Sequence, residues 1–314
     1  MDKQLSIVIV NYGTPDLVLN FLKSAQNNAD SSIISEVVIV DNEYPNKGDS
    51  RKIIIPGSFS FKIQFVQNLE KSYASGVNRG VALAAMDTIV IANSDVELLP
   101  QFSLRPLVEK LWQDSYIGIT GPQLVYPDRR WQRNYGQFSS LWGAFISLTM
   151  LDSFWRGIIM WAFRRNWLSK QPRTVHYIDG AFMVIKRDCF EEMGGFDESY
   201  TFYGEDADFC WRAWRNGWKV VFVPSVQVVH IRGASSRKVA ISKYALKLIQ
   251  AERKFVEEHF GSQQARWYGR LNRLAFCERA WLYSFVAQLT HSSRWQQRAF
   301  EVRALCNAAK KGIV

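Results

Sequence analysis

The chain has 314 residues, 47% of them hydrophobic, and a formal net charge of +10. This apolar content is ample for a packed core, and the length allows one large domain or two. The four cysteines show no CxxC spacing, so the sequence indicates neither a zinc site nor a disulfide framework. We therefore expect four buried thiols, in a reducing cytoplasm, at Cys189, Cys210, Cys277 and Cys306. The first residues, MDKQLSIVIVNY, enter a strand at once, so we expect no signal peptide.

The first third of the chain alternates between apolar runs and helical patterns. Continuous β-branched runs predict strands that are buried on both faces of a sheet, at 5–10, 36–40, 61–66 and 88–92. Apolar residues at helical spacing predict helices between them, at 15–27 and 76–85. This alternation indicates an α/β domain with a mostly parallel sheet.

Polar residues follow three of these predicted strands. Asn11, Asp41 and Asp95 all fall where a buried run ends. Ligands of parallel sheets bind off the carboxyl ends of the strands. Each carboxylate alone could be a strand-end cap or a turn residue, but two at neighbouring strand ends favour a binding site.

The stretch 176–233 concentrates reactive side chains. Glu205, Asp206 and Asp208 place three acids within four positions, and a strand-like run at 219–229 leads directly into His230. A solvated acidic helix start would explain the acids alone, because carboxylates suit the positive end of the helix dipole. Together with a histidine at a strand tip, the acids point to a general base and a metal ligand in one site.

The order of motifs in this stretch resembles the family 2, GT-A-type glycosyltransferases. The matching motifs are Gly194-Gly195-Phe196-Asp197-Glu198, Glu205-Asp206-Ala207-Asp208, Gly217-Trp218 and Val228-Val229-His230. The first half is similar to the same family in SIVIVNY, VIVDN, QNLEKSYASGVNRG and NSDVELLP. The branch that it resembles most contains bacterial rhamnosyltransferases of polysaccharide assembly. The resemblance implies a GT-A, Rossmann-like sheet.

The resemblance also implies the chemistry. It suggests an inverting transferase that moves a sugar, such as rhamnose, from a dTDP- or UDP-linked donor to a hydroxyl of a glycan or a lipid-diphosphate-linked acceptor. Asp206 would be the catalytic base, with Glu205 beside it contacting the acceptor, and their like charges would raise one pKa. Asp95 and His230 would hold Mg²⁺ or Mn²⁺, which would neutralise the leaving diphosphate.

Further site residues come from the same resemblance. The donor nucleotide would meet Asn11, Asp41, Asn78, Ser94 and Asp95, and the sugar or acceptor pocket would be lined by Asp179, Gly180 and Trp211. The sequence departs from the family at two places. Asn93 stands where the family has the first acid of its D-x-D motif, so Asp95 would be the main carboxylate at the metal. Leu69 and Glu70 replace the more usual small residue and glycine of the donor loop.

Residues 129–173 interrupt the α/β pattern with an insert that is rich in tryptophan and arginine. Five of the chain's twelve tryptophans lie here among eight basic residues: Trp131, Trp142, Trp155, Trp161 and Trp167, with Arg129, Arg130, Arg133, Arg156, Arg164, Arg165, Lys170 and Arg173. Such a composition favours a segment lying in a membrane interface. The alternative is a contact with another protein, domain or subunit.

The last quarter of the chain carries the whole charge excess. Residues 236–314 hold 15 lysines and arginines against 5 acids, and helical spacing predicts helices at 239–260, 263–289 and 293–311. We therefore expect a GT-A catalytic domain at 1–235, which includes the insert, and a basic helical appendage at 236–314. A basic appendage indicates an anionic partner, so we expect a cytoplasmic enzyme held on the inner face of the membrane.

Two other classes of protein compete with this interpretation. A non-catalytic nucleic-acid- or membrane-binding protein would explain the basic, aromatic helices. Against nucleic acid, the sequence has no helix-turn-helix, RRM or zinc-finger pattern. A Rossmann dehydrogenase needs G-x-G-x-x-G after its first strand, whereas NYGTPD contains a single glycine.

Overall fold

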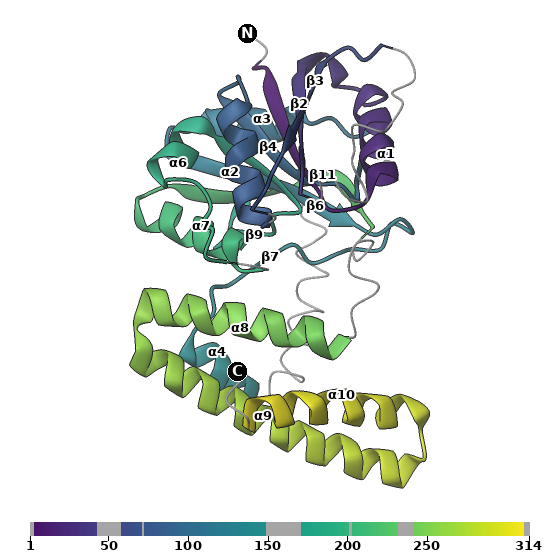
Figure 1. The fold of residues 1–314 in the computed structure, drawn as a ribbon, viewed down its shortest axis with the longest axis vertical. Helices are drawn as coiled ribbons and strands as arrows, with labels where there is room; N and C mark the ends of the chain where they lie inside the picture. Colours follow the sequence, from purple (N-terminus) through teal and green to yellow (C-terminus); the bar gives the residue numbers. More distant parts are fainter. Residues whose placement is uncertain are drawn as a thin grey trace. The chain divides into compact units, whose positions relative to one another are not determined.

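The computed structural model describes residues 3–42, 58–70, 72–148, 171–200, 203–231 and 241–310 (Figure 1). The chain forms two compact units. The first comprises Met1–Phe138, Ser169–Thr201 and Glu205–Ser236, and the second comprises Ser139–Leu168, Phe202–Gly204 and Arg237–Val314.

This division differs from the expected one in the insert. The described residues 139–148 of the insert belong with the C-terminal helices and not with the first unit. The reason lies in α4 (Leu141–Leu148), which packs against α9 (Ser262–Thr290) within the second unit. Arg279 of α9 also donates to the carbonyl oxygen of Ser147. Trp155, Trp161, Trp167, Arg156, Arg164, Arg165 and Lys170 of the insert lie outside the described residues.

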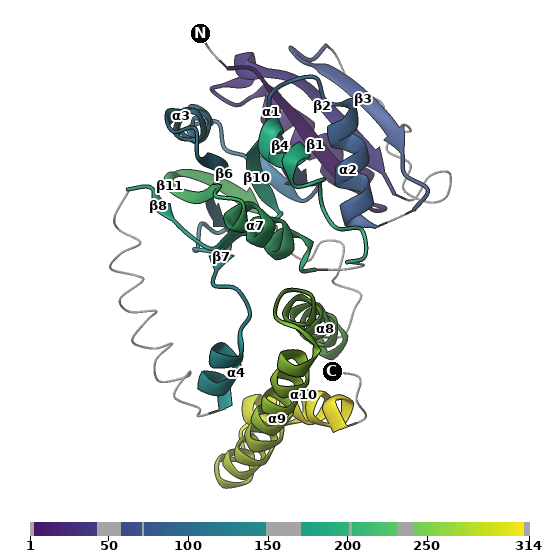
Figure 2. The same ribbon diagram turned by 90° about the vertical axis from the view of Figure 1, so that its left-hand side faces the viewer.

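The first unit is built on a central sheet. In the described residues its strands are β1 (Leu5–Asn11), β2 (Ile34–Asp41), β3 (Lys62–Gln67), β4 (Thr88–Asn93), β5 (Val96–Leu98), β6 (Ile117–Val125), β8 (Arg173–Thr174), β10 (Phe182–Lys186) and β11 (Lys219–His230). Their order is β3-β2-β1-β4-β10-β6-β11-β5, and β8 pairs with β11 (Figure 2). β10 is antiparallel to both β4 and β6. Consequently β1, β2, β3, β4, β6 and β11 run in one direction, and the prediction of a mostly parallel sheet is confirmed.

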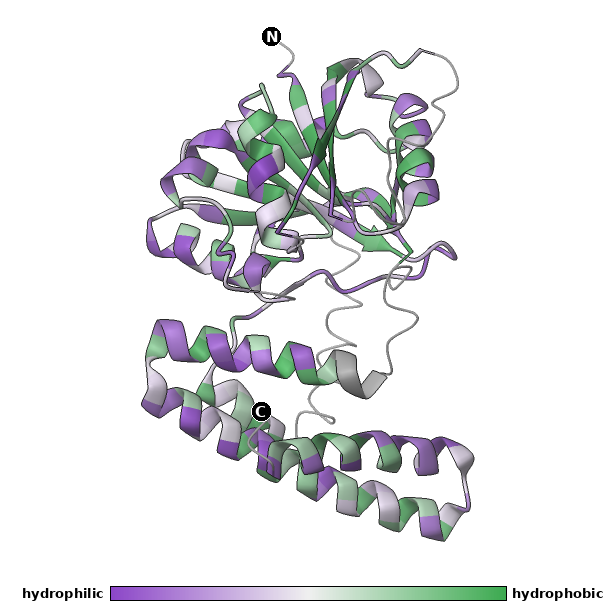
Figure 3. Cartoon of the chain, viewed as in Figure 1, coloured by the Kyte–Doolittle hydropathy of each residue, from purple (hydrophilic) through white to green (hydrophobic). Residues whose placement is uncertain are grey.

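Helices cover both faces of this sheet. The helices are α1 (Pro15–Gln26), α2 (Tyr73–Leu83), α3 (Arg105–Gln113), α6 (Arg187–Glu192) and α7 (Glu205–Arg215), with a short 3-10 turn, η1, at Ser31–Ile33. Along β1, Ile7 and Ile9 join a core with α1 and α3, whereas Val8 and Val10 join a core with α2, α6 and α7. Burial on both faces explains why the parallel strands read as continuous apolar runs (Figure 3).

Two glycines allow α2 to press against the sheet. A Cβ atom on Gly80 would lie 2.3 Å from Cγ1 of Val8, and one on Gly76 would lie 2.9 Å from Cγ1 of Val10. Only residues without a side chain fit at these positions. The Ser72 hydroxyl begins the helix by accepting a hydrogen bond from the Ser75 amide. The close approach brings the first turn of α2 to the carboxyl edge of the sheet.

The strand register gathers polar residues at that edge. Asn11 pairs with Asp41 across β1 and β2, and Val10 pairs with Asn93. Because β10 runs the opposite way and begins opposite Ala92, the residues that precede it lie at the same edge. His230 ends β11 on this side as well.

The second unit consists of helices in the part of the chain that the structure describes. Besides α4 and α9 it contains α8 (Ile241–Phe260) and α10 (Ser293–Lys310). Gly261 and His291, with φ of 91° and 49°, reverse the chain between α8, α9 and α10. Tyr268 donates to the Glu252 carboxylate, which links α9 to α8.

The cysteine expectation is half wrong. Cys277 of α9 and Cys306 of α10 form a disulfide, with Cα atoms 5.2 Å apart. The bridge arises because the turn at His291 folds α10 back against α9. Cys189 and Cys210 are buried free thiols, as expected.

Candidate active site

The Asp206 carboxylate is held by backbone amides at the start of α7. Gly180 donates its N–H to Asp206 Oδ2 at 2.8 Å, and Ala207 donates to Oδ1 at 2.8 Å. The Gly180 carbonyl oxygen in turn accepts a hydrogen bond from the Tyr73 hydroxyl at 2.8 Å. The residues before β10, the first turn of α2 and the first turn of α7 therefore meet at one point.

Glu205, the neighbouring acid, is buried, and one of its carboxyl oxygens has no hydrogen bond to the described residues. It is 7% exposed, and its Oε2 atom has no hydrogen-bond partner among the described residues. Burial, followed by the charge of Asp206, raises the pKa of Glu205 to about 8. Burial also raises the pKa of Asp206, although the amides of Gly180 and Ala207 oppose this by stabilising the charged form. Like-charge repulsion was expected to be the cause of the shift, but burial is the larger one.

One of these two acids is therefore protonated while the other is charged. Near neutral pH the proton belongs on Glu205, whose Oε2 atom has no hydrogen-bond partner among the described residues, and the negative charge belongs on Asp206, which accepts two N–H groups. Acid–base sites typically contain two carboxyl groups whose surroundings favour the protonated form of one and the charged form of the other. Asp206 is accordingly placed as a proton acceptor and Glu205 as a hydrogen-bond donor.

Tyr73 connects these acids to Asp95. Burial first, and then the charges of Glu205, Asp206 and Asp95, raise the pKa of the Tyr73 phenol well above its usual range. All three carboxylates thus lie close enough to act on one ring. The sequence prediction missed Tyr73, although an aromatic residue at the first position of a helix beside a strand edge is a usable signal.

Asp95 and His230 come together as expected. Nε2 of His230 lies 3.2 Å from Oδ1 of Asp95, and both side chains are buried. The other ring nitrogen, Nδ1, lies 2.6 Å from Oε1 of Gln132. Gln132 also donates through Nε2 to the His230 carbonyl oxygen at 3.2 Å, which fixes which end of its amide faces the ring.

Gln132, which the sequence prediction missed, decides the state of the histidine. Its Oε1 atom can only accept, so the Nδ1 atom of His230 carries the proton. With the proton on Nδ1, Nε2 is the ring atom that would be left to bind a cation beside Asp95. An outer hydrogen bond of this kind is the usual way in which a metal-binding histidine is oriented.

These donors fit a divalent cation. A carboxylate oxygen and an imidazole nitrogen suit Mn²⁺, and Mg²⁺ is the alternative where oxygen ligands dominate. In the described ranges, no set of three protein ligands includes Asp95 and His230. A cation held there would therefore take further ligands from a diphosphate and from water.

The expected donor residues form one hydrogen-bonded chain. Asn11 donates to Asp41 Oδ1 at 3.3 Å and accepts from both the amide and the hydroxyl of Thr14. Because the Thr14 proton goes to Asn11, the Ser94 hydroxyl donates to Thr14 Oγ1 at 3.0 Å. Asn11, Asp41 and Ser94 thus lie together at the edge that also carries Asp95.

Asn78 does not join this group. Its Nδ2 atom donates to the Phe196 carbonyl and to Glu198 Oε1, and its Oδ1 atom accepts from the Phe196 amide. Both amide hydrogens are therefore used by the turn at 194–198. The structure gives Asn78 a structural role in that turn, and its contact with the nucleotide stays a prediction.

Asp208, the third acid of the motif, is also structural. Its carboxylate accepts from Arg212 at 2.8 Å, and Arg212 also donates to the carbonyl oxygens of Met193 and Gly195. This ion pair fastens the glycine turn to α7. Of the three acids at 205–208, Glu205 and Asp206 therefore form the candidate acid–base pair, and Asp208 has a structural role.

The expected acceptor residues lie in two places. Gly180 is at the Asp206 carboxylate, and Asp179 lies next to it, with its amide bonded to the Asn134 carbonyl. Trp211 lies instead in an aromatic group. Its ring forms a T-shaped pair with Phe138, with centroids 4.9 Å apart, and stacks on Trp214, with centroids 6.1 Å apart. This group adjoins the short β7–β9 pair (Tyr135–Gly136 and Tyr177–Ile178), where Phe138 contacts Tyr177.

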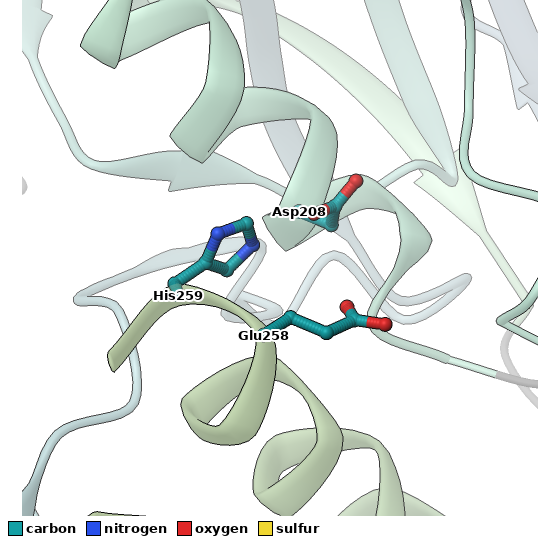
Figure 4. A group of neighbouring side chains, drawn as sticks. All are labelled: Asp208, Glu258 and His259. Atoms are coloured by element: carbon teal, nitrogen blue, oxygen red, sulfur yellow. The ribbon is translucent and has the colours of Figure 1, made fainter. Parts of the chain in front are cut away.

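A second group of potential ligands is drawn in Figure 4. Asp208 belongs to the first unit and is already paired with Arg212, whereas Glu258 and His259, near the end of α8, belong to the second. We assign no metal site to these three residues. Among the described helices, none combines the length and apolar character required to cross a bilayer.

Comparisons with known proteins show which proteins this chain is similar to. The chain is 31% identical over 185 residues to the N-acetylglucosaminyl-diphospho-decaprenol L-rhamnosyltransferase of two Mycobacterium tuberculosis strains. That match covers 55% of this chain and 60% of the mycobacterial protein. It is also 26% identical over 205 residues to the O-antigen biosynthesis protein RfbC of Myxococcus xanthus, covering 62% of this chain and 14% of that protein.

Two solved structures share the fold. The mannosyltransferase PcManGT from Pyrobaculum calidifontis, in complex with GDP-Man and Mn²⁺, has a TM-score of 0.63 at 14% identity, covering 99% of this chain and 87% of its own. GalNAc-T7 with UDP, GalNAc and Mn²⁺ has a TM-score of 0.56 at 17% identity, covering 81% and 48%. Both are glycosyltransferases, so the expected GT-A-type α/β fold is confirmed.

The family follows from a match to a family model. The model described as "Glycosyltransferase like family 2" matches residues 3–245, which include every residue of the site described above. This match leaves the non-catalytic alternative without support. The chain therefore belongs to the glycosyltransferase-like family 2.

Proposed function

We propose that this protein is an inverting glycosyltransferase that moves a sugar from a nucleotide-diphosphate donor to a hydroxyl group. The observation that carries the proposal is the meeting of two pairs around Tyr73. One pair is Asp206 with a protonated Glu205, and the other is Asp95 with His230. The first can take a proton from an alcohol, and the second can face a diphosphate.

The Asp206 carboxylate acts as the base. It accepts the proton of the acceptor hydroxyl while that oxygen attacks the anomeric carbon from the face opposite the diphosphate. The new glycosidic bond forms as the bond between the anomeric carbon and the diphosphate oxygen breaks, which inverts the configuration. The Gly180 and Ala207 amides keep the base oriented, and the protonated Glu205 donates a hydrogen bond to the acceptor.

Asp95 and His230 would hold the divalent cation, with Gln132 fixing the imidazole. A bound Mg²⁺ or Mn²⁺ supplies charge neutralisation for the leaving nucleoside diphosphate. Asn11, Asp41 and Ser94 would bind the nucleotide at the adjoining strand ends. Asp179 and Gly180 would line the sugar or acceptor pocket.

The relatives suggest the substrates. The mycobacterial relative is named for transfer of L-rhamnose to a polyprenol diphosphate carrying a sugar. We propose a dTDP- or UDP-linked donor, with rhamnose as the transferred sugar, and a lipid-diphosphate-linked acceptor in cell-surface polysaccharide synthesis. Such an acceptor would be met by an enzyme attached to the inner, anionic face of the membrane.

Binding and turnover can be tested separately. Purified protein is screened against a panel of nucleotide sugars for thermal stabilisation, with and without Mn²⁺, since a ligand that binds the folded state raises the apparent stability. The stabilising donor is then incubated with a lipid-diphosphate acceptor, and the anomeric configuration of the product is read by NMR. We expect metal-dependent stabilisation and an inverted product. A retained configuration, or full turnover in excess chelator, would contradict the mechanism.

A further inference from the structure

The helix α9 carries a row of large apolar side chains that remain exposed. The row consists of Trp267, Leu274, Trp281, Phe285 and Leu289. The successive spacings of seven, seven, four and four residues place all five on one side of the helix. Trp281 is 69% exposed and stacks on Phe285 with ring centroids 5.8 Å apart. A row of this kind is usually buried against a partner, because helices bury their apolar face.

A groove with positive charge adjoins this row between α9 and α10. Its volume is about 240 Å³, and the Cys277–Cys306 bridge contributes to its lining. Arg303 and Lys310, two turns apart on α10, line it from one side, and Trp281 lines it from the other. In the part of the chain that the structure describes, no carboxylate lines the groove and neither cation is ion-paired.

The charge of both helices has the same sign. α9 contains four arginines and a single acid, Glu278, and α10 contains three arginines, one lysine and Glu301. Arg270 lies over the ring of Trp267 at 4.9 Å, so cations accompany the apolar row as well as the groove. An apolar row with a basic border is typical of helices that lie in a membrane interface.

We propose that α9 and α10 form a docking surface for an anionic phospholipid bilayer, with the row among the acyl chains and a lipid phosphate in the groove. Trp281 belongs to both features, so head group and chain would be contacted side by side, as they are joined in a lipid. The inference rests on the proposed attachment of the enzyme to an anionic membrane, but not on sugar transfer.

Charge and apolar character together favour a bilayer over a second copy of the chain or nucleic acid as the partner of this surface. A second copy would bring the same positive charge to the contact and would be repelled. Nucleic acid would satisfy Arg303 and Lys310 but would leave Leu274, Phe285 and Leu289 in water. A bilayer with anionic head groups satisfies both, since phosphates meet the cations and acyl chains meet the apolar row.

The charged half of the surface is tested by co-sedimentation with vesicles of equal parts phosphatidylglycerol and phosphatidylcholine. The double variant Arg303→Gln/Lys310→Gln should bind roughly tenfold to thirtyfold more weakly at low salt, given the usual contribution of a basic residue near an anionic leaflet. The matched control is Lys23→Gln/Arg215→Gln, which removes the same charge from exposed positions of the first unit. The control should bind within about twofold of the wild type.

The apolar half needs its own variant. Trp281→Ser/Phe285→Ser keeps every charge, so its loss of vesicle binding should persist at high salt, where the contribution of the cations is screened. Circular dichroism and thermal melting verify that each variant is folded.

Three results would overturn the docking surface. They are equal binding of the wild type to anionic and neutral vesicles at low salt, an equal loss in the control, and either a concentration-dependent dimer that the Ser variant abolishes or a DNA complex that the Arg303→Gln/Lys310→Gln variant abolishes. Turnover on a short soluble acceptor separates this inference from the proposed function. It should be unchanged in all these variants, and a protein that binds vesicles but transfers no sugar would contradict the proposed function alone.

Discussion

Glu36 at the amino edge of the central sheet and the pair Glu205 and Asp206 at the carboxyl edge are buried acids whose pKa values shift in opposite directions. At the amino edge, Glu36 accepts hydrogen bonds from the Ser6 hydroxyl, the Ala85 amide and the Gln64 side chain. These donors outweigh the effect of burial and hold its pKa below the usual value. At the carboxyl edge, burial raises the pKa values of Glu205 and Asp206.

The difference separates structure from chemistry. Asp30 follows the pattern of Glu36, because its carboxylate accepts from the Leu104 and Arg105 amides and from the Ser103 hydroxyl, and its pKa is lowered. Donors to the carboxylates of Glu36 and Asp30 hold both in the charged form, so neither readily takes a proton. Glu205 has no partner at Oε2 among the described residues, so this atom can still interact with a substrate. The raised pKa values of Glu205 and Asp206 therefore distinguish this pair from the carboxylates that hold the fold together.

The largest expected effect is a loss of turnover when the acids at the carboxyl edge are substituted. Asp206→Asn should lower the turnover number by about 10²- to 10⁴-fold, because it removes the base. Glu205→Gln should cost far less, since an amide can still donate where the protonated acid donated. Initial rates with saturating donor measure both, and thermal stabilisation by the donor checks that binding persists. Equal losses in the two variants, or a larger loss in Glu205→Gln, would move the base to Glu205.

The pH dependence of stability should sharpen the comparison. The pKa of Glu205 is raised to about 8, so the folded state keeps a proton that the unfolded state loses above about pH 4.5. The free energy of unfolding therefore falls as pH rises from there to about 8, by up to roughly 1.4 kcal/mol per pH unit. Denaturant titrations of wild type and Glu205→Gln should diverge over this interval. Parallel curves would contradict a buried, protonated Glu205.

At the amino edge, the contribution of Glu36 to the free energy of unfolding should depend on pH in the opposite direction. Because the pKa of Glu36 is lowered, its stabilisation is present above its unfolded value and is lost as pH falls through the folded one. Glu36→Gln should therefore lower the free energy of unfolding by about 1 to 3 kcal/mol at neutral pH, and less in acid. Turnover per folded molecule should not change, as measured by rate against active-site titration. A change in turnover without a loss of stability would place Glu36 in the reaction.

Sequence reasoning found the residues that local patterns mark. Asp95 and His230 were predicted from strand ends, and Asp206 from an acid run at a helix start, because strand and helix boundaries are local properties. Tyr73 and Gln132 were missed because their roles depend on contacts across 107 and 98 residues, which no short pattern encodes. The role of Asn78 in the turn at 194–198 was missed for the same reason, since its partners lie 118 and 120 residues away.

The smallest expected effect concerns the second pair at the carboxyl edge. Gln132→Met keeps the volume of the side chain but removes the acceptor for the His230 Nδ1 proton, so the imidazole loses its fixed tautomer and orientation. Loss of such an outer partner typically costs about 10- to 100-fold in metal affinity. Mn²⁺ titration of donor-induced thermal stabilisation measures this without reference to turnover.

Gln132→Glu retains an acceptor oxygen and should recover most of the affinity, which a merely structural role would not predict. Gln227→Met, a half-buried change on the same strand as His230, is the matched control and should leave the Mn²⁺ titration unchanged. If Gln132→Met and Gln132→Glu weaken Mn²⁺ equally, the orientation of His230 does not depend on this hydrogen bond.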